Sequence, residues 1–209
     1  KVVGSAGTAI NDFSVQGGDI AADMDRIYWT TMGVIGAPVV RQFMLAGGGP
    51  LVIANEANVV NPQDCYWRIA VVDQAVYWSE GSTLHPVGCA IRKVPVSGGT
   101  VATLVDQKFM GDFTVDNVNV YFSEFDNIGS IRRLSVNGGA STEVASNVYA
   151  WVMGNDAESL YWLDLQKGSP GGMEKTAGPT DWVTIPIDLL MDPFSAFEAV
   201  LIDPTGFYI

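Results

Sequence analysis

Three carboxylates hold comparable positions along the chain and are the side chains best suited to acid–base chemistry. Asp19 and Asp112 each stand four residues before a recurring aspartate, and Glu198 stands five residues before another. Two carboxyl groups on either side of a glycosidic bond can hydrolyse it, one as acid and the other as base or nucleophile. The apolar stretches beside such positions, "IAVV" and "AVLI", offer no polar groups to hold sugar hydroxyls. We therefore expect no catalytic activity, with a carbohydrate-active chain as the alternative.

The composition argues against several other functions. The 209 residues include 11 Lys and Arg against 23 Asp and Glu, a formal net charge of −12. Nucleic acids and anionic membranes are therefore unfavourable partners, because both bind basic patches. No apolar run approaches the roughly 20 residues of a membrane span. With one histidine, no phosphate-binding loop and no metal-ligand spacing, we expect neither a cofactor nor a metal site.

The two cysteines, Cys65 and Cys89, allow one disulfide. Cys65 precedes the first expected strand of its repeat, and Cys89 follows the loop between the second and third strands. Both positions map to the same face, so the two sulfurs can meet. A bond would indicate an oxidising compartment; two buried free thiols are the alternative.

The recurring aspartates mark a repeat. Phrases such as "DMDRIYWTT", "DQAVYWSE" and "DNVNVYFSE" return at intervals of 40 to 50 residues, beginning at Asp23, Asp73, Asp116, Asp156 and Asp203. A short apolar run precedes each aspartate. The fuller copies continue with "IRKVPV" or "IRRLSV", a Gly-Gly turn and a last apolar segment. Four strands in 40 to 50 residues are typical of a β-propeller blade.

Each part of the repeat has a structural interpretation. The aromatic pair suits a strand packed between two sheets, where every sheet needs large side chains at equivalent places. The aspartate is expected to cap backbone amides in the turn between the first two strands. The glycine pairs are expected in turns because glycine readily adopts a positive φ. These pairs occur in "LAGGGP", "VSGGT", "VNGGA" and "SPGGM".

The repeat resembles the YWTD propellers of lipoprotein-receptor ectodomains, and more closely the bacterial propeller repeats written D-x-x-x-V-Y-W…V-P…G-G. The resemblance covers nearly the whole chain, and the matching quartets begin at Tyr28, Tyr77, Tyr121 and Tyr161. Only the last quartet ends in aspartate, Asp164. The resemblance implies a β-propeller in a secreted, periplasmic or cell-surface setting, and it implies no catalysis.

The two ends of the chain are expected to complete one blade. "KVVGSAGT" at residues 1–8 matches "KVPVSGGT" at residues 93–100, the third strand of a repeat, while "AVLIDPTGFYI" at the C-terminal end supplies a first and second strand. The prediction is a single all-β domain, residues 1–209. It forms a five-bladed β-propeller of four-stranded antiparallel blades with a composite closing blade. The period leaves about 14 residues missing from that blade. Either a loop has been cut away or the chain is a piece of a longer one.

The loops that enter each blade differ from one another, whereas the Gly-Gly turns of the opposite face repeat. Counting back from the aspartates places large side chains at the channel mouth, namely Trp67, Met110, Trp151 and Phe197. Acidic side chains are expected on its rim, namely Glu80, Glu124 and Asp126. The aromatic rings either bind a partner or fill the top of a small ring. We expect a non-enzymatic binding or scaffold module for a protein or carbohydrate ligand; the alternative is a lectin or glycoside hydrolase.

Overall fold

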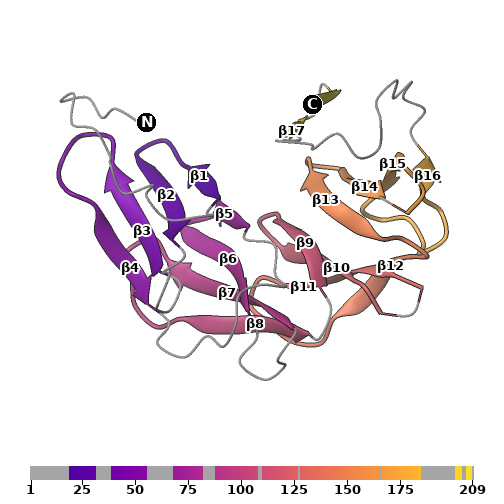
Figure 1. Cartoon of the computed structure of the whole chain (residues 1–209), viewed down its shortest axis with the longest axis horizontal. Helices are drawn as coiled ribbons and strands as arrows, with labels where there is room; N and C mark the ends of the chain where they lie inside the picture. The colour runs from indigo at the N-terminus through magenta and orange to yellow at the C-terminus, as the bar shows by residue number, and fades with distance from the viewer. Residues whose placement is uncertain are drawn as a thin grey trace. The chain divides into compact units, whose positions relative to one another are not determined.

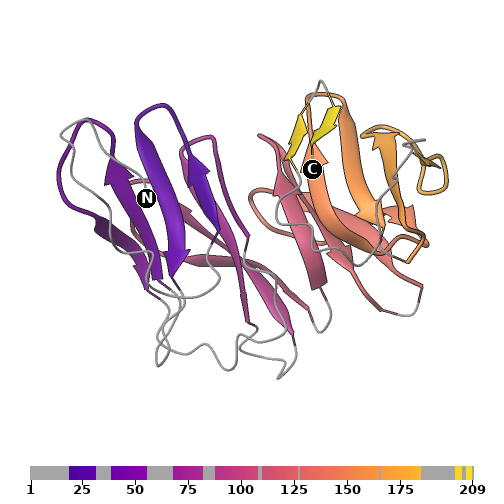
Figure 2. The ribbon, with the colours of Figure 1, turned by 45° about the horizontal axis from the view of Figure 1, so that its top comes forward.

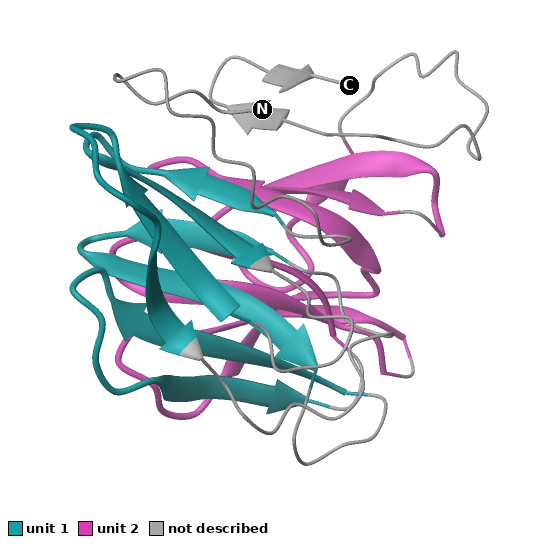
Figure 3. Cartoon of the chain, turned by 60° about the vertical axis from the view of Figure 1, so that its left-hand side comes forward, with its two compact units in different colours: residues 1–108 teal, residues 109–209 magenta. Residues whose placement is uncertain are grey.

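The computed structural model describes the strands and loops of most of the chain. The described residues are 19–31, 39–55, 68–81, 88–107, 110–126, 128–164, 166–184, 201–203 and 206–208. They form antiparallel β-sheets, and no helix occurs within these ranges. The chain divides into two compact units, residues 1–108 and residues 109–209, coloured teal and magenta in Figure 3. The expected single domain stays a prediction.

Unit 1 contains two four-stranded sheets in which each strand pairs with the next one along the chain. The first sheet consists of β1 (Ile20–Ala22), β2 (Arg26–Thr31), β3 (Val39–Met44) and β4 (Leu51–Asn55). The second consists of β5 (Ile69–Val72), β6 (Ala75–Gly81), β7 (Cys89–Pro95) and β8 (Ala102–Gln107).

Unit 2 contains two further four-stranded sheets of the same order and a hairpin (Figure 1). The third sheet consists of β9 (Met110–Val115), β10 (Asn119–Glu124), β11 (Ser130–Ser135) and β12 (Thr142–Ser146). The fourth consists of β13 (Ala150–Asn155), β14 (Ser159–Asp164), β15 (Ser169–Glu174) and β16 (Val183–Thr184). The hairpin pairs β17 (Leu201–Asp203) with β18 (Gly206–Tyr208). The first strands of the two sheets, β9 and β13, lie side by side (Figure 2).

The aromatic pair joins neighbouring sheets within each unit, as predicted. Successive side chains of a strand point to opposite faces, so the tyrosine and the residue after it serve different interfaces. In unit 1, Tyr28 of the first sheet and Trp78 of the second share one buried cluster. In unit 2, Tyr121 of the third sheet and Trp162 of the fourth do the same. The tyrosine of one sheet thus faces the next sheet, and the tryptophan faces the preceding one.

The repeated aspartates cap the turns between the first two strands in three sheets, which confirms that prediction. Asp23 Oδ1 accepts the backbone N–H groups of Asp25 and Arg26 at 2.8 and 2.7 Å. Asp116 and Asp156 make the same pair of bonds in the third and fourth sheets. Such short bonds hold the turn at the point where the chain reverses.

The second sheet turns differently because its tyrosine follows its aspartate one residue sooner than in the other three sheets. Asp73 and Gln74 both have positive φ, 46° and 61°, and Val72 pairs directly with Ala75. Two left-handed residues between paired strands are the geometry of a tight two-residue hairpin. The shorter spacing between Asp73 and Tyr77 therefore reflects a change of turn, and the strand that follows keeps its register.

The glycine pairs lie in turns at three of the four predicted places. Gly47 with Gly48, Gly98 with Gly99, and Gly138 with Gly139 all have positive φ. The turns are longer than two residues; in the second sheet the strands end at Pro95 and resume at Ala102. The prediction for "SPGGM" is wrong, because Gly171 and Gly172 lie inside β15. A Cβ on Gly171 would come within 2.6 Å of the Trp162 ring, so the ring requires a glycine there.

The chain ends and the cysteines are each described in part. The C-terminal hairpin β17–β18 is present, but residues 1–18, which are expected to complete its sheet, lie outside the described residues. Cys89 is disulfide-bonded, which confirms the bond at that residue. Cys65 is the only other cysteine of the chain and lies outside the described residues.

Candidate functional site

The two described carboxylates that suggested acid–base chemistry are bound to backbone N–H groups of the neighbouring sheet. Asp19 Oδ2 accepts the N–H of Ile69 at 3.1 Å in unit 1. Asp112 Oδ2 accepts the N–H of Met153 at 2.7 Å in unit 2, where the Asp112 side chain is buried. Asp19 stands directly before β1 and bonds to β5, and Asp112 of β9 bonds to β13, so each bond links the first strand of one sheet, or its start, to the first strand of the next. Both carboxylates are therefore structural ties, and Glu198 lies outside the described residues.

Glu80 is not on a rim, and that prediction is wrong. Its residue is fully buried, and Oε1 accepts a hydrogen bond from Arg92 Nε at 2.6 Å. Its other oxygen accepts the Trp78 indole N–H at 2.7 Å. Arg92 also donates to the Thr103 hydroxyl. The strand register explains this network. Arg92 lies directly opposite Trp78, and Trp78 stands two residues before Glu80 in β6.

Asp126 is exposed, as the rim prediction requires, and the Glu124 side chain is 16% exposed. Glu124 is half-buried and its Oε2 lies 3.6 Å from Arg132 Nη1, beyond hydrogen-bonding distance. Burial raises the pKa of Glu124, and the neighbouring Asp126 raises it further, while Arg132 lowers it less. Asp126 is exposed and opens a turn in which its carbonyl accepts the N–H of Gly129 at 2.7 Å.

Trp151 belongs to a group of three half-buried aromatic rings at the start of β13. The Phe125 ring centroid lies 5.2 Å from that of Trp151 and 5.8 Å from that of Tyr149. The ring planes are tilted by 44° and 40°. These three residues are called the aromatic cluster below. Met110, also expected at the mouth, is buried in β9.

Two glycines make room for the aromatic cluster. A Cβ on Gly111 would collide with the Phe125 ring and come within 2.8 Å of the Ala150 carbonyl oxygen. Gly129 has a φ of 70°, and a Cβ there would come within 2.5 Å of the Val148 carbonyl oxygen and 3.0 Å of the Tyr149 ring. A side chain at Gly111 would displace the Phe125 ring, and one at Gly129 would displace the backbone that leads to Tyr149, so the cluster depends on both glycines.

The backbone that carries Tyr149 is held by its neighbours in unit 2. Asp164 Oδ2 accepts the Tyr149 N–H at 3.3 Å, and the Val148 N–H donates to the Gly129 carbonyl at 3.3 Å. Asp164 also accepts the N–H groups of Gln166 and Lys167. The last aspartate of the "YWLD" quartet thus anchors the segment that leads into β13.

Sequence reasoning identified Trp151, Glu124 and Asp126 but missed Phe125 and Tyr149. The available signal was the pair of glycines, Gly111 and Gly129, which fall outside the Gly-Gly turns and outside the aspartate phrase. Trp67 and Phe197, the other two predicted aromatic residues, lie outside the described residues.

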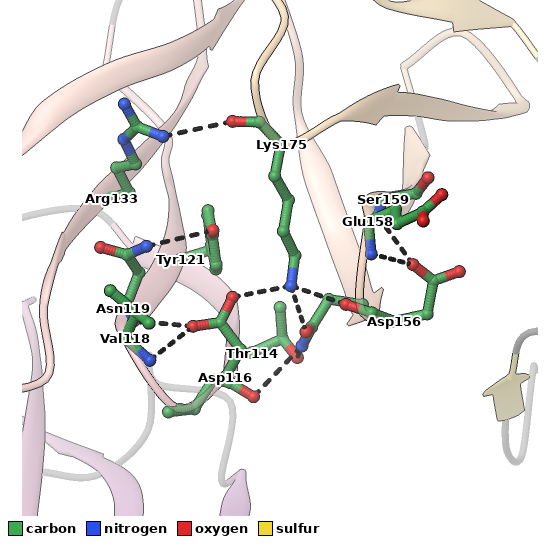
Figure 4. A network of polar contacts seen from close by, with 12 residues as sticks. Thr114, Asp116, Val118, Asn119, Tyr121, Arg133, Asp156, Glu158, Ser159 and Lys175 are labelled. Carbon is green, nitrogen blue, oxygen red and sulfur yellow. Dashed lines mark hydrogen bonds and ion pairs between the residues drawn. The ribbon is translucent and has the colours of Figure 1, made fainter.

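The opposite ends of β9 and β13 carry a polar network centred on Lys175 (Figure 4). The Lys175 ammonium donates to Asp116 Oδ2 at 2.7 Å, Asn155 Oδ1 at 2.9 Å and the Asp156 carbonyl at 2.6 Å. Burial alone would raise the pKa of Asp116; the bonds from Lys175 and from two backbone N–H groups outweigh it and lower that pKa. All three N–H bonds of the ammonium have an acceptor, so Lys175 serves the fold at this end of unit 2.

Within the described ranges, no three His, Cys, Asp or Glu side chains are placed to hold a metal ion. The same ranges contain no helix with the length and apolar character needed to cross a membrane.

The chain matches no protein-family model and no curated protein. Solved structures do resemble it. TolB from Acinetobacter baumannii has a TM-score of 0.59 and 12% identity, with 79% of this chain and 43% of that one covered. A protein described as TolB from Agrobacterium tumefaciens has a TM-score of 0.58 and 13% identity, with 80% and 63% covered. The β-propeller domain of the Trilobed protease from Pyrococcus furiosus has a TM-score of 0.51 and 5% identity, with 83% and 58% covered.

These likenesses establish the fold. The chain is a β-propeller built from four-stranded antiparallel sheets, and it spans between 43% and 63% of the lengths of these three chains. At identities of 5% to 13% the likeness concerns the backbone and says nothing about ligands.

Proposed function

We propose that this chain is a non-enzymatic binding propeller that holds a protein or glycan ligand at the aromatic cluster. One observation carries the proposal. The three rings of the cluster are partly exposed, and side chains at Gly111 and Gly129 would disturb their arrangement. Aromatic rings that are not needed to fill a core are common anchors of binding surfaces. Glu124 and Asp126 supply polar groups beside the rings.

The state of the acidic residues supports binding over catalysis. A glycosidase needs two carboxyl groups free to reach the sugar, but Asp19 and Asp112 each accept a backbone N–H group from the next sheet. A lectin remains the second candidate, because an aromatic ring with adjacent carboxylates can also bind a sugar.

The proposal includes a five-bladed ring of the YWTD-like type, whose last blade combines β17 and β18 with the N-terminal residues. The support is the period of the repeat and the presence of the C-terminal hairpin. It also includes a secreted, periplasmic or cell-surface location, for which the disulfide at Cys89 is the support.

Glycan and peptide arrays probed with the whole chain and with Trp151→Ala test the proposal. We expect a ligand whose binding falls at least about 30-fold in the variant, the loss of one anchor of roughly 2 kcal/mol. The melting temperature of each protein, measured in parallel, separates lost contact from lost folding. If Trp151→Ala lowers the melting temperature while every array signal is unchanged, the cluster is core packing and the proposal is wrong.

A further inference from the structure

The surroundings of the aromatic cluster are acidic and apolar at once. Asp126 directly follows Phe125 and is exposed, and Ile128 in the same turn is 63% exposed. Glu124, on the other side of Phe125, has its pKa raised by burial and by Asp126. A positive charge placed here would stabilise both carboxylates.

Two basic residues lie near this end of unit 2, and among the ion pairs of the described residues neither is paired with Asp126. Arg132 donates through Nε to the Ser141 hydroxyl at 3.0 Å and reaches Glu124 only at 3.6 Å. Lys167 pairs with Asp164 at 3.2 Å and lies 4.5 Å from the centroid of the Trp182 ring. Neither cation neutralises Asp126, so the charge beside the rings is complementary to a cationic ligand.

The spacing of the rings suits a cation. A cation is attracted to an aromatic face from within about 6 Å of the centroid. The centroids of the two ring pairs are 5.2 and 5.8 Å apart, so one charged group can lie within that range of two rings.

We propose that the aromatic cluster, with Asp126 and Glu124, binds a lysine or arginine side chain of a partner protein. The rings of Phe125, Tyr149 and Trp151 contact the cation and its apolar stem, and the two carboxylates provide the counter-charge. This inference rests on the proposed binding function and names the chemistry of its ligand.

The test uses fluorescein-labelled tetra-arginine, its neutral isostere tetra-citrulline and an arabinan oligosaccharide as probes of the whole chain. We expect tetra-arginine to bind at least tenfold more tightly than tetra-citrulline at equal ionic strength. Asp126→Asn should weaken tetra-arginine binding about fivefold, as should Tyr149→Leu, which removes a ring and keeps apolar bulk. Asp126 is exposed, so its variant keeps the fold even where Tyr149→Leu does not.

Asp25→Asn is the matched control, because it removes one exposed carboxylate from unit 1 and changes the net charge equally. It should leave tetra-arginine binding unchanged. Equal losses in Asp25→Asn and Asp126→Asn would mean diffuse attraction to an acidic chain, and equal binding of the two peptides would also overturn the inference. Binding of the oligosaccharide that depends on Trp151 would reject the cationic ligand and leave the proposed function standing. If variants of the aromatic cluster change neither the binding of any probe nor any array signal, both the cationic ligand and the proposed binding function are wrong.

Discussion

Glu80 in unit 1 and Glu124 in unit 2 hold the same position in successive repeats but lie in different surroundings. In both sheets an arginine lies opposite the residue two positions before the glutamate. Glu80 is fully buried and bonded by Arg92 and by an indole N–H. Glu124 is half-buried and lies 3.6 Å from its arginine.

The difference comes from one aromatic residue. Trp78 supplies an N–H that binds the second oxygen of Glu80, whereas Phe122 in the equivalent position of the third sheet has none. A carboxylate with both oxygens bonded can be buried; one with a single distant cation stays closer to water. The same repeat position is therefore structural in unit 1 and available for binding in unit 2.

The largest expected effect is that of Glu80→Gln. Removing this charge leaves the guanidinium of Arg92 buried without a counter-charge, and the free energy of unfolding should fall by about 4 kcal/mol. Urea unfolding followed by tryptophan fluorescence measures the loss. Glu124→Gln is the matched control and should change stability by less than about 1 kcal/mol. Equal losses in the two variants would refute the contrast between the two sites.

Lys175→Val should have the next largest effect. Lys175 in the fourth sheet and Val96 in the second hold equivalent positions. The backbone N–H of each donates to a carbonyl in the turn between the first two strands of its sheet. At this position the interface between the first and second sheets is apolar, with Val71 and Val96 near Tyr28. The interface between the third and fourth sheets instead depends on the Lys175 ammonium, which has three oxygen partners. Loss of the ammonium leaves those oxygens without a hydrogen-bond donor, and the free energy of unfolding should fall by about 3 kcal/mol.

A double variant sharpens this comparison. Asn155→Val combined with Lys175→Val copies the apolar arrangement of unit 1 and leaves Asp116 available to accept from the Tyr121 hydroxyl, as Asp23 accepts from Tyr28 at 2.7 Å. The double variant should be more stable than Lys175→Val alone. If it is less stable, apolar packing cannot replace the polar network at this interface.

Asp112 and Asp19, the two carboxylates that bond to a neighbouring sheet, should contribute to stability in the order of their burial. Asp112→Ala leaves a buried N–H of Met153 without its acceptor, and should cost about 2 kcal/mol. Asp19→Ala exposes the N–H of Ile69 to water more readily, because the Asp19 side chain is 33% exposed, and should cost about 1 kcal/mol. Chemical unfolding of the two variants measures both. An equal cost would show that water does not reach the bond in unit 1.

The fold could be predicted largely from the sequence because each repeat carries its own local signals. The aspartate caps, the aromatic pair and the disulfide at Cys89 depend on residue type and spacing. The burial of Glu80 could not be predicted, because it depends on Arg92 and Trp78 meeting across strands. The role of Gly171 was misjudged because glycine in a strand and glycine in a turn look alike until a ring is placed against one of them.

The candidate site was harder to predict for the same reason. Trp151 follows from counting positions within the repeat, but Phe125 lies one residue beyond its quartet and contacts Trp151 only because Gly111 leaves space. Contacts between side chains of different strands are visible in the sequence only indirectly, here through the two glycines that lie outside the Gly-Gly turns.

The smallest expected effect is the pH dependence of Glu124→Gln. Burial and Asp126 raise the pKa of Glu124, so the folded chain binds this proton more tightly than the unfolded chain. Ionisation of Glu124 therefore reduces stability at neutral pH, and this loss disappears as the pH falls through the folded pKa towards the ordinary value of 4.5. The variant should melt about 1–2 °C above the parent chain at pH 7, and the gap should close near pH 4. Glu158→Gln, at an exposed carboxylate elsewhere in unit 2, is the control for net charge. A gap that persists at pH 4, or one shared with Glu158→Gln, would show that Glu124 is not under electrostatic strain and has no need of a cationic ligand.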